Sequence, residues 1–413
     1  MSTPLKTEKL YEADAYCRAF SAAVLSCEAA EDRPGQYRVV LDRTAFFPEG
    51  GGQYADTGTL QADKADCETP LTEPVRVLDA QIDADGVITH LCSGPLPSGA
   101  LVTGTLDWEQ RFARMQNHTG EHLVSGTVHR LFGLDNIGFH LGDGDVTCDF
   151  NGELTEAQLR DVERVANRAV FDNVEVLCAY PDPATLPDLD YRSKLDLTED
   201  VRLVTIPGYD VCACCAPHVA RTGEVGLIKL VNAEKAHGGT RVHLLCGPWA
   251  LDDYNVKQRN IMRIVDLTST PQEETAEAVE ALQAQNGRLT HSLSVAQQHQ
   301  AEIALVFLRE LPGEGQNRAI FLPGLETDAL RALANGGRDL CDGVFVALTA
   351  AAEGGPYRYI ATANDLPLSR LSKEFNAALD GRGGGKDNMI QGSFAAPLET
   401  ILDYFVQNRF EKE

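Results

Sequence analysis

The stretch RMQNHTGEHLVSGTVHRLFG, residues 114–133, has the spacing of a helix that turns one face to a core. Gly133 is a suitable stop for this helix. His118 and His122 lie four residues apart, so they project from one face, one turn apart, as two imidazoles must to share a metal ion. A histidine pair alone also fits ordinary hydrogen bonding. The predicted face carries Met115, His118, His122, Val124, Val128 and Leu131.

A second pair of metal-binding residues strengthens the metal hypothesis. The segment GYDVCACCAPHVARTGEVG (208–226) places Cys214 and His218 four apart, and the intervening proline favours a loop or turn. Two imidazoles from a helix with a thiolate and an imidazole from a loop make a tetrahedral nitrogen and sulfur set, which suits zinc. Cys212 and Cys215 are rival ligands by position, and all three cysteines could instead be buried structural thiols.

The residue order argues against a zinc peptidase. Such enzymes carry their general base directly after the first histidine, as His-Glu-x-x-His. Here Glu121 directly precedes the second histidine, and we expect it to point away from the ligand face.

The first hundred residues predict β structure. QYRVVLD (36–42) leads to the glycine-rich turn at 50–52, and Asp85-Gly86 joins two further strands as a hairpin. A small barrel or a sandwich is expected. The two strands of this hairpin are VRVLDAQI (75–82) and VITHLC (87–92), and the strand that follows them is ALVTGTLDW (100–108).

Two further helices are expected along the chain after the first one. LTEAQLRDVERVANRAVFDN (154–173) predicts a second amphipathic helix with Thr155 as its N-cap. Residues 272–310 predict a long polar helix with a heptad seam, which would pair two copies or pack within its own chain. The seam contains Val279, Leu282, Asn286, Leu289, Leu293, Ala296, Gln300 and Ile303.

The predicted fold is therefore α+β with several domains. We expect strands in AIFLPG (319–324), VFVALTA (344–350) and YRYIATA (357–363), and helices near 326–336 and 369–379. The expected domains are a β-barrel-like domain with the glycine-rich loop, a zinc-binding α+β domain, a helical spacer and a C-terminal α/β domain, at 1–105, 106–250, 251–312 and 313–413.

Composition narrows the function. The net charge of −25, from 36 basic and 61 acidic residues in 413, argues against broad nucleic-acid binding, but a local basic cluster could still hold RNA. No stretch approaches the roughly 20 apolar residues of a membrane span, and the N-terminus lacks a secretory layout. The expected location is the cytoplasm, where the 11 cysteines would stay reduced apart from metal ligands.

Four motifs together resemble a known family. RTAFFPEGGGQYADTG (43–58), HTGEH (118–122) and CCAPH with VARTGEVG (214–226) are similar, in order and spacing, to the editing region of alanyl-tRNA synthetases and to free-standing AlaX editing proteins. GRGGGKDNMIQG (381–392) resembles the glycine-rich motif of their C-terminal RNA-binding domain. The whole arrangement looks like the long AlaX form.

This resemblance implies a zinc-dependent hydrolase that deacylates misacylated tRNA(Ala), with Ser-tRNA(Ala) as the first expected substrate and Gly-tRNA(Ala) as the second. It implies metal ligands His118, His122, Cys214 and His218, a tRNA partner, a homodimer, no membrane and no use of ATP. The candidate catalytic residues are Thr44 and Gln53, and the candidate substrate-binding residues are Gly50, Gly51, Gly52, Arg111 and Arg114. The candidate RNA-binding residues are Arg370, Lys373, Arg382, Gly383, Gly384, Gly385, Lys386 and Gln391.

One departure keeps alternatives open. Cys215, Ala216 and Pro217 replace the small Gly-Gly-Thr stretch of the family, which affects both the choice of cysteine ligand and the acyl group that fits. A zinc-stabilised tRNA-binding protein without catalysis, or a hydrolase of another small ester, would carry the same ligands. Four protein ligands would also close the coordination of zinc, so substrate positioning is an alternative to water activation.

Overall fold

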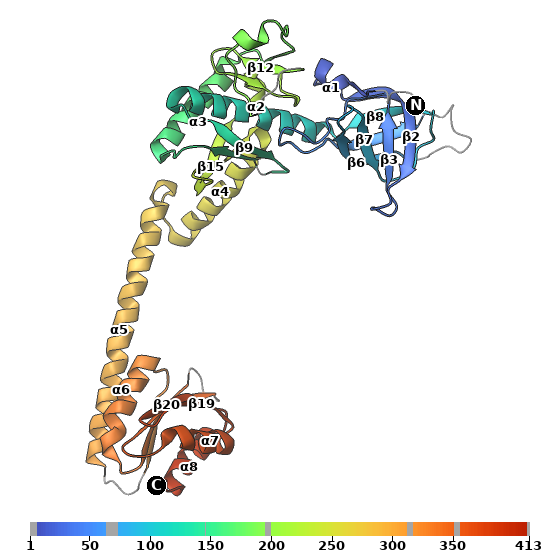
Figure 1. The fold of residues 1–413 in the computed structure, drawn as a ribbon. Coiled ribbons are helices and arrows are strands. Elements are labelled where there is room, and N and C mark those ends of the chain that lie inside the picture. Colours follow the sequence, from blue (N-terminus) through green and yellow to red (C-terminus); the bar gives the residue numbers. More distant parts are fainter. Residues whose placement is uncertain are drawn as a thin grey trace. The chain divides into compact units, whose positions relative to one another are not determined.

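The computed structural model describes residues 6–62, 73–144, 146–194, 200–311, 317–350 and 356–410 (Figure 1). They form an α+β protein of two compact units, Met1–Asn260 and Ile261–Glu413. The predicted domain boundary at 312–313 lies outside the described residues. Among the helices that the structure describes, none combines the length and the apolar composition that a membrane span requires.

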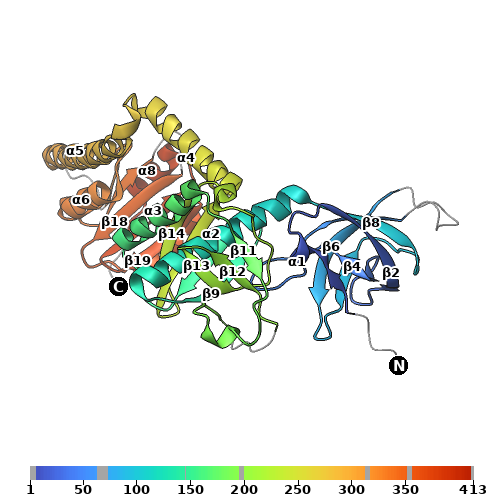
Figure 2. The ribbon, with the colours of Figure 1, turned by 90° about the horizontal axis from the view of Figure 1, so that it is seen from above.

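The N-terminal strands close into a barrel, which decides between the two predicted β architectures (Figures 1 and 2). All its neighbouring strands are antiparallel, and the predicted hairpin joins β6 to β7. A short parallel pair, β1 (Glu8–Lys9) with β4 (Arg43–Thr44), lies beside α1 (Leu10–Ala13). In spatial order the barrel contains β2 (Ala19–Ala29), β3 (Tyr37–Leu41), β7 (Ile88–Cys92), β6 (Val75–Ile82), β5 (Gly58–Ala62) and β8 (Leu101–Leu106).

Helix α2 (Trp108–Phe132) follows the barrel and confirms the first predicted helix. It ends where Gly133 takes a φ of 66°, a left-handed conformation that glycine adopts at low cost. Helix α3 (Glu156–Asp172) begins at the predicted N-cap, where Thr155 and Gln158 form a capping box. Both helices pack on an antiparallel sheet of β14 (Ile228–Ala236), β15 (Gly239–Cys246), β10 (Val146–Phe150) and β9 (Asn136–Leu141).

A second, three-stranded sheet completes the part of the chain around α2. It contains β11 (Leu177–Ala179), β12 (Leu203–Ile206) and β13 (Asp210–Ala213), all antiparallel. Strand β13 packs against α2, so the loop after it runs beside the histidine-bearing face of the helix. The fold therefore brings together two segments almost a hundred residues apart.

Two helices connect this part to the C-terminal domain. Helix α4 (Gly247–Thr268) is followed by α5 (Thr275–Glu310), which confirms the predicted long helix. The packing face of α5 includes Gln297 and Ala301, which are buried against the C-terminal domain. The predicted heptad seam faces away from this contact, since its leucines, Val279 and Ile303 are 39–60% exposed.

Among the described residues, the C-terminal domain contains a five-stranded sheet and three α-helices besides α5. Strand β16 pairs with β17 in parallel, and the other pairs of this sheet are antiparallel. The three predicted strands and the two predicted helices are all present. Helix α8 (Leu398–Gln407) was not predicted. The sheet order is β16 (Arg318–Phe321), β17 (Val344–Thr349), β18 (Tyr357–Ala363), β20 (Met389–Phe394) and β19 (Gly381–Lys386), with helices α6 (Thr327–Gly337) and α7 (Leu368–Ala378).

The glycine-rich segment of this domain is the edge strand β19, not a solvated loop. The side chain of Tyr359, on β18, lies over β20 and reaches β19. A Cβ atom at Gly392 would come within 2.9 Å of its ring, and one at Gly383 within 2.8 Å of its hydroxyl oxygen. These glycines therefore give the tyrosine ring its space in the sheet.

Candidate metal centre

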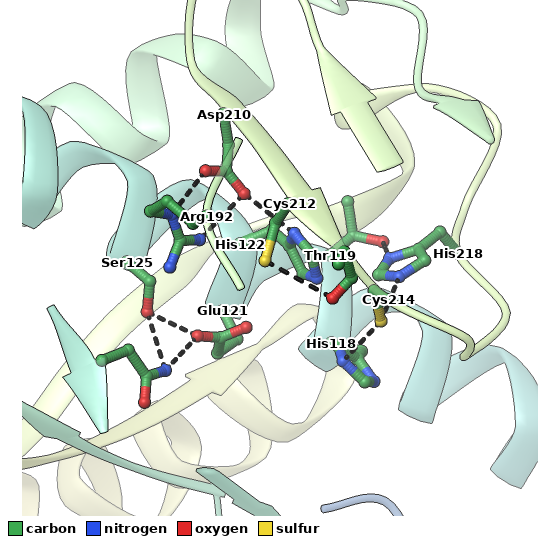
Figure 3. Close-up of polar contacts among 12 residues, drawn as sticks. His118, Thr119, Glu121, His122, Ser125, Arg192, Asp210, Cys212, Cys214 and His218 are labelled. Atoms are coloured by element: carbon green, nitrogen blue, oxygen red, sulfur yellow. Dashed lines mark hydrogen bonds and ion pairs between the residues drawn. The ribbon is translucent and has the colours of Figure 1, made fainter. Parts of the chain in front are cut away.

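Four side chains converge beside α2 as the sequence predicted (Figure 3). His118 and His122 come from the helix, and Cys214 and His218 from the loop after β13. The Cys214 Sγ atom lies 3.5 Å from Nε2 of His118 and 3.4 Å from Nε2 of His218. A nitrogen and a sulfur bound to the same tetrahedral zinc ion are about 3.6 Å apart. The spacing therefore fits a metal ion of this size.

The ionisation of these groups suits metal binding. Burial, with the charge of His122, lowers the pKa of His118 to about 3, and burial likewise lowers the pKa of His218 well below its usual value. These imidazoles are therefore neutral at neutral pH, with lone pairs available. Burial raises the pKa of the Cys214 thiol, so a metal ion must displace its proton to bind sulfur.

Each of the three histidines is held at Nδ1 by a different partner. His118 Nδ1 lies 2.8 Å from the Gln53 side-chain oxygen, and His122 Nδ1 lies 2.9 Å from an Asp210 carboxylate oxygen. His218 Nδ1 lies 3.0 Å from the Thr119 hydroxyl. Hydrogen bonds at Nδ1 fix the imidazole rings and leave Nε2 for a metal ion. The four donor atoms lie within 4.8 Å of one another, and this group could hold a metal.

The geometry distinguishes between the rival cysteines. Cys214 belongs to the group with all three histidines, whereas Cys212 groups only with His122 and Asp210. Cys215 is exposed and faces the glycine-rich turn, where a Cβ atom at Gly51 would lie 3.6 Å from its sulfur. The cysteine assigned from the sequence is therefore the one best placed to bind the metal.

A cavity of about 970 Å³ opens onto this cluster. Glu121 lines it together with His118 and His122, so the expectation that this glutamate points away from the ligand face is wrong. Residues three apart on a helix are neighbours, and this spacing keeps Glu121 beside His118. The cavity is also lined by Lys6, Lys9, Glu12, Gly51, Gly52, Phe139, Tyr180, Arg192, Lys194, Arg202, Cys212, Cys214 and Cys215.

The glycine-rich turn brings only part of the predicted site together. Gly51 and Gly52 line the cavity with φ values of 60° and 84°, and Gly50 closes the turn by backbone hydrogen bonds with Gln53. Gln53 supports His118, as described above. Thr44 is outside the cavity lining, and its buried hydroxyl lies 2.9 Å from His90 Nε2.

The two candidate arginines lie in the first turns of α2 and are buried. The Arg111 guanidinium pairs with Asp56 and donates to the Ala15 carbonyl oxygen at 3.1 Å. Arg114 donates to the Ala55 carbonyl oxygen at 2.5 Å and pairs with Asp143 at 2.8 Å. Both side chains tie the first turns of α2 to the segment that follows the glycine-rich turn.

The C-terminal candidates gather on two neighbouring elements. Arg370 and Lys373 are exposed on α7, and the remaining candidates lie on β19 and β20. Of these, the side chains of Arg382, Lys386 and Gln391 are also exposed.

Apart from Gln53, the residues that support the ligands were not predicted from the sequence. Thr119 could have been noticed because it stands between the two helix histidines, and Asp210 because it is four residues before Cys214. Asn136 and Ser125, which hold Glu121, carry no comparable signal in the sequence.

Comparisons with known proteins agree with the geometry. Residues 201–243 match the family "Threonyl and Alanyl tRNA synthetase second additional domain", and residues 6–110 match "tRNA synthetases class II (A)". The alanyl-tRNA editing protein AlaX-L of Pyrococcus horikoshii is 27% identical over 96% of both chains. The mouse alanyl-tRNA editing protein Aarsd1 is 27% identical over 98% of this chain and 99% of its own.

Other matches cover only part of this chain. The alanine–tRNA ligase of Ignicoccus hospitalis is 32% identical over 67% of this chain, which spans 30% of the length of that ligase. The C-Ala domain of Aquifex aeolicus alanyl-tRNA synthetase aligns with 24% of this chain at 20% identity, with a TM-score of 0.20. Over nearly its whole length the chain is similar to alanyl-tRNA editing proteins of the AlaX-L and Aarsd1 type, and its four-residue cluster could hold a metal.

Proposed function

We propose that this protein is a zinc-dependent deacylase of misacylated tRNA(Ala), with Ser-tRNA(Ala) as its main substrate and Gly-tRNA(Ala) as its second. The observation that carries the proposal is the set of three histidines, each held at Nδ1, that gather with Cys214; His118, His122 and Cys214 line the cavity. A bound zinc ion would supply a Lewis acid to the ester carbonyl. Gln53, Asp210 and Thr119 would keep the imidazoles in place.

The size and charge of the cavity support an aminoacylated RNA end as the ligand. Its volume of about 970 Å³ is at the upper end of the roughly 300–1,000 Å³ range of small-ligand pockets. Five basic and four acidic residues line it, whereas acidic residues far outnumber basic ones in the whole chain. Exposed lysines at the rim, such as Lys194, would meet terminal phosphates.

An alanine-activating site cannot strongly exclude serine or glycine by size, so a separate hydrolytic site is needed to remove them. The direct test measures release of amino acid from Ser-, Gly- and Ala-tRNA(Ala) by the zinc-loaded protein, with and without a chelator. We expect chelator-sensitive release of serine, weaker release of glycine and no release of alanine. Absence of serine release from the zinc-loaded protein would contradict the proposal.

The exposed cationic side chains of the C-terminal domain would bind the tRNA backbone. Four basic and two acidic residues lie between Arg370 and Lys386, which reverses the overall charge of the chain. Replacing Arg382 and Lys386 together by alanine should weaken tRNA binding and make it less dependent on salt, because fewer counterions are released. Unchanged affinity and salt dependence would exclude this segment from the tRNA interface.

We also propose that two copies pair through the seam of α5. Asn286 and Gln300 occupy the same heptad position, so in a parallel, in-register pair each would meet its own counterpart. Leu289→Asp should give a monomer in light scattering. Leu267→Asp, a matched change at an exposed leucine outside the seam, should leave the dimer intact. A monomeric wild-type protein would contradict the pairing.

A zinc ion held by four protein ligands would have no open coordination position, and this favours a second candidate function. Structural zinc sites use four protein ligands, whereas catalytic zinc usually keeps a position open. A tRNA-binding protein that uses zinc only for stability would bind Ser-tRNA(Ala) and release no serine in the same assay.

A further inference from the structure

Glu121 has a contact pattern that the metal cluster does not explain (Figure 3). Its Oε1 atom accepts hydrogen bonds from the Ser125 hydroxyl and, at 2.5 Å, from the Asn136 side-chain amide. Asn136 also donates to the Ser125 oxygen at 3.0 Å. These bonds hold the carboxylate in one orientation, and neither bond to Glu121 uses its second oxygen, Oε2.

This glutamate differs from the other acidic residues around the cavity. Glu8 pairs with Arg43 at 3.2 Å, and Glu12 accepts from Lys9 at 3.2 Å. Asp200 is exposed. Glu121 is 5% exposed, the only buried carboxylate among the described residues of the cavity lining. Within the part of the chain that the structure describes, Glu121 forms no ion pair.

The nearby cationic groups have other contacts. Arg192 is engaged by both carboxylate oxygens of Asp210, at 2.8 and 2.9 Å. The Lys194 ammonium lies 5.4 Å from the centre of the Phe139 ring. Glu121 is also outside the group of four metal donors. Burying a carboxylate costs free energy unless a positive group lies beside it. Because Glu121 lines the cavity, a ligand bound there could supply that positive group.

We propose that Glu121 binds the α-ammonium group of the aminoacyl ester and thereby positions the ester beside the metal cluster. The inference rests on the proposed function and names the substrate class more closely: esters with a free α-amino group. The ammonium and the carbonyl of such an ester are attached to the same carbon. Fixing the ammonium at Glu121 on α2 therefore restrains the carbonyl near His118 and His122, which project from the same helix.

The test uses two probes that contain an amide in place of the ester, so the protein cannot hydrolyse an ester in them. Both are adenosines in which a 3′-amide carries serine, one with a free α-amino group and one with that group acetylated. Calorimetric titration of zinc-loaded wild-type protein should show about tenfold or tighter binding of the free-amino probe, because a charged hydrogen bond is lost on acetylation. The Glu121→Gln variant keeps an oxygen for Ser125 and Asn136, and should bind both probes about equally.

Two controls separate this role from a structural one. Zinc content of Glu121→Gln, measured by mass spectrometry, should equal that of the wild type. Ser125→Ala, which removes one hydrogen bond but keeps the carboxylate, should retain the preference for the free-amino probe. The inference is overturned if Glu121→Gln keeps that preference, or if the wild-type protein shows no preference.

The outcome is distinguishable from a failure of the proposed function. A wild-type protein that prefers the free-amino probe but releases no serine from Ser-tRNA(Ala) would refute the deacylase and support the role of Glu121. A wild-type protein that releases serine but binds both probes equally would support the deacylase and refute the role of Glu121.

Discussion

Asp210→Asn tests whether the residues behind the ligands control metal binding. Asp210 accepts hydrogen bonds from Nδ1 of His122 at 2.9 Å and from Nε and Nη2 of Arg192. Burial raises the pKa of this carboxyl, but the hydrogen bonds from His122 and Arg192 outweigh it and lower the pKa overall. Asparagine has nearly the same shape, so the substitution removes mainly the negative charge.

The expected loss follows from these contacts. Removing the partner that orients a metal-binding histidine costs about 10- to 100-fold in metal affinity. The variant should therefore bind zinc about 10- to 100-fold more weakly, or about 1.4–2.7 kcal/mol less favourably. Because Arg192 is largely buried, its side chain being 14% exposed, the metal-free variant should also lose about 3 kcal/mol of folding stability.

Competition with a chromogenic chelator measures the affinity, and thermal unfolding with and without zinc measures the stability. Asp149→Asn is the matched control. Asp149 forms the same two-oxygen pair with Arg241, at 2.7 and 2.8 Å, without touching a predicted ligand. The control should lose stability and keep wild-type zinc affinity. A folded Asp210→Asn protein that binds zinc as tightly as the wild type would show that Asp210 does not control metal binding.

Two further substitutions test the glycine-rich turn and the candidate catalytic residue Thr44. Gly52→Ala places a methyl group 2.4 Å from the Phe139 carbonyl oxygen, so it should sharply reduce serine release and lower the melting temperature. Gly99→Ala is the control, because Gly99 has the same φ of 84° and no neighbour within 4 Å of the added methyl group. It should lower the stability only by the backbone strain. Thr44→Val removes a hydroxyl bonded to His90, outside the cavity lining, so serine and glycine release should fall equally; a selective loss of serine release would instead support direct sensing of the serine hydroxyl.

The local features of the fold could be predicted because they depend on short sequence patterns. The histidine spacing, the stop at Gly133 and the cap at Thr155 each involve residues within a few positions of one another. The paired motifs also predicted that Cys214 and His218 would meet the helix, although neither motif alone is specific. The structure agrees at each of these positions.

The rest depends on contacts between distant segments. Closure of the barrel requires β2 and β5 both to pair with β8, and no local pattern specifies this. The same holds for the bond between Gln53 and His118, which joins positions 65 residues apart. The buried positions of Arg111 and Arg114 could not be predicted either, since arginine side chains are mostly exposed in folded proteins.

We propose that the four-residue cluster binds the zinc ion on which deacylation depends. The most direct measurement combines zinc content and serine release from Ser-tRNA(Ala) for the wild type and the His118→Ala/Cys214→Ala double variant. We predict that the folded double variant retains no zinc and releases no serine, while the wild type does both and loses activity with a chelator. Zinc bound at the wild-type level in the double variant would contradict the site, and serine release without zinc would contradict the mechanism.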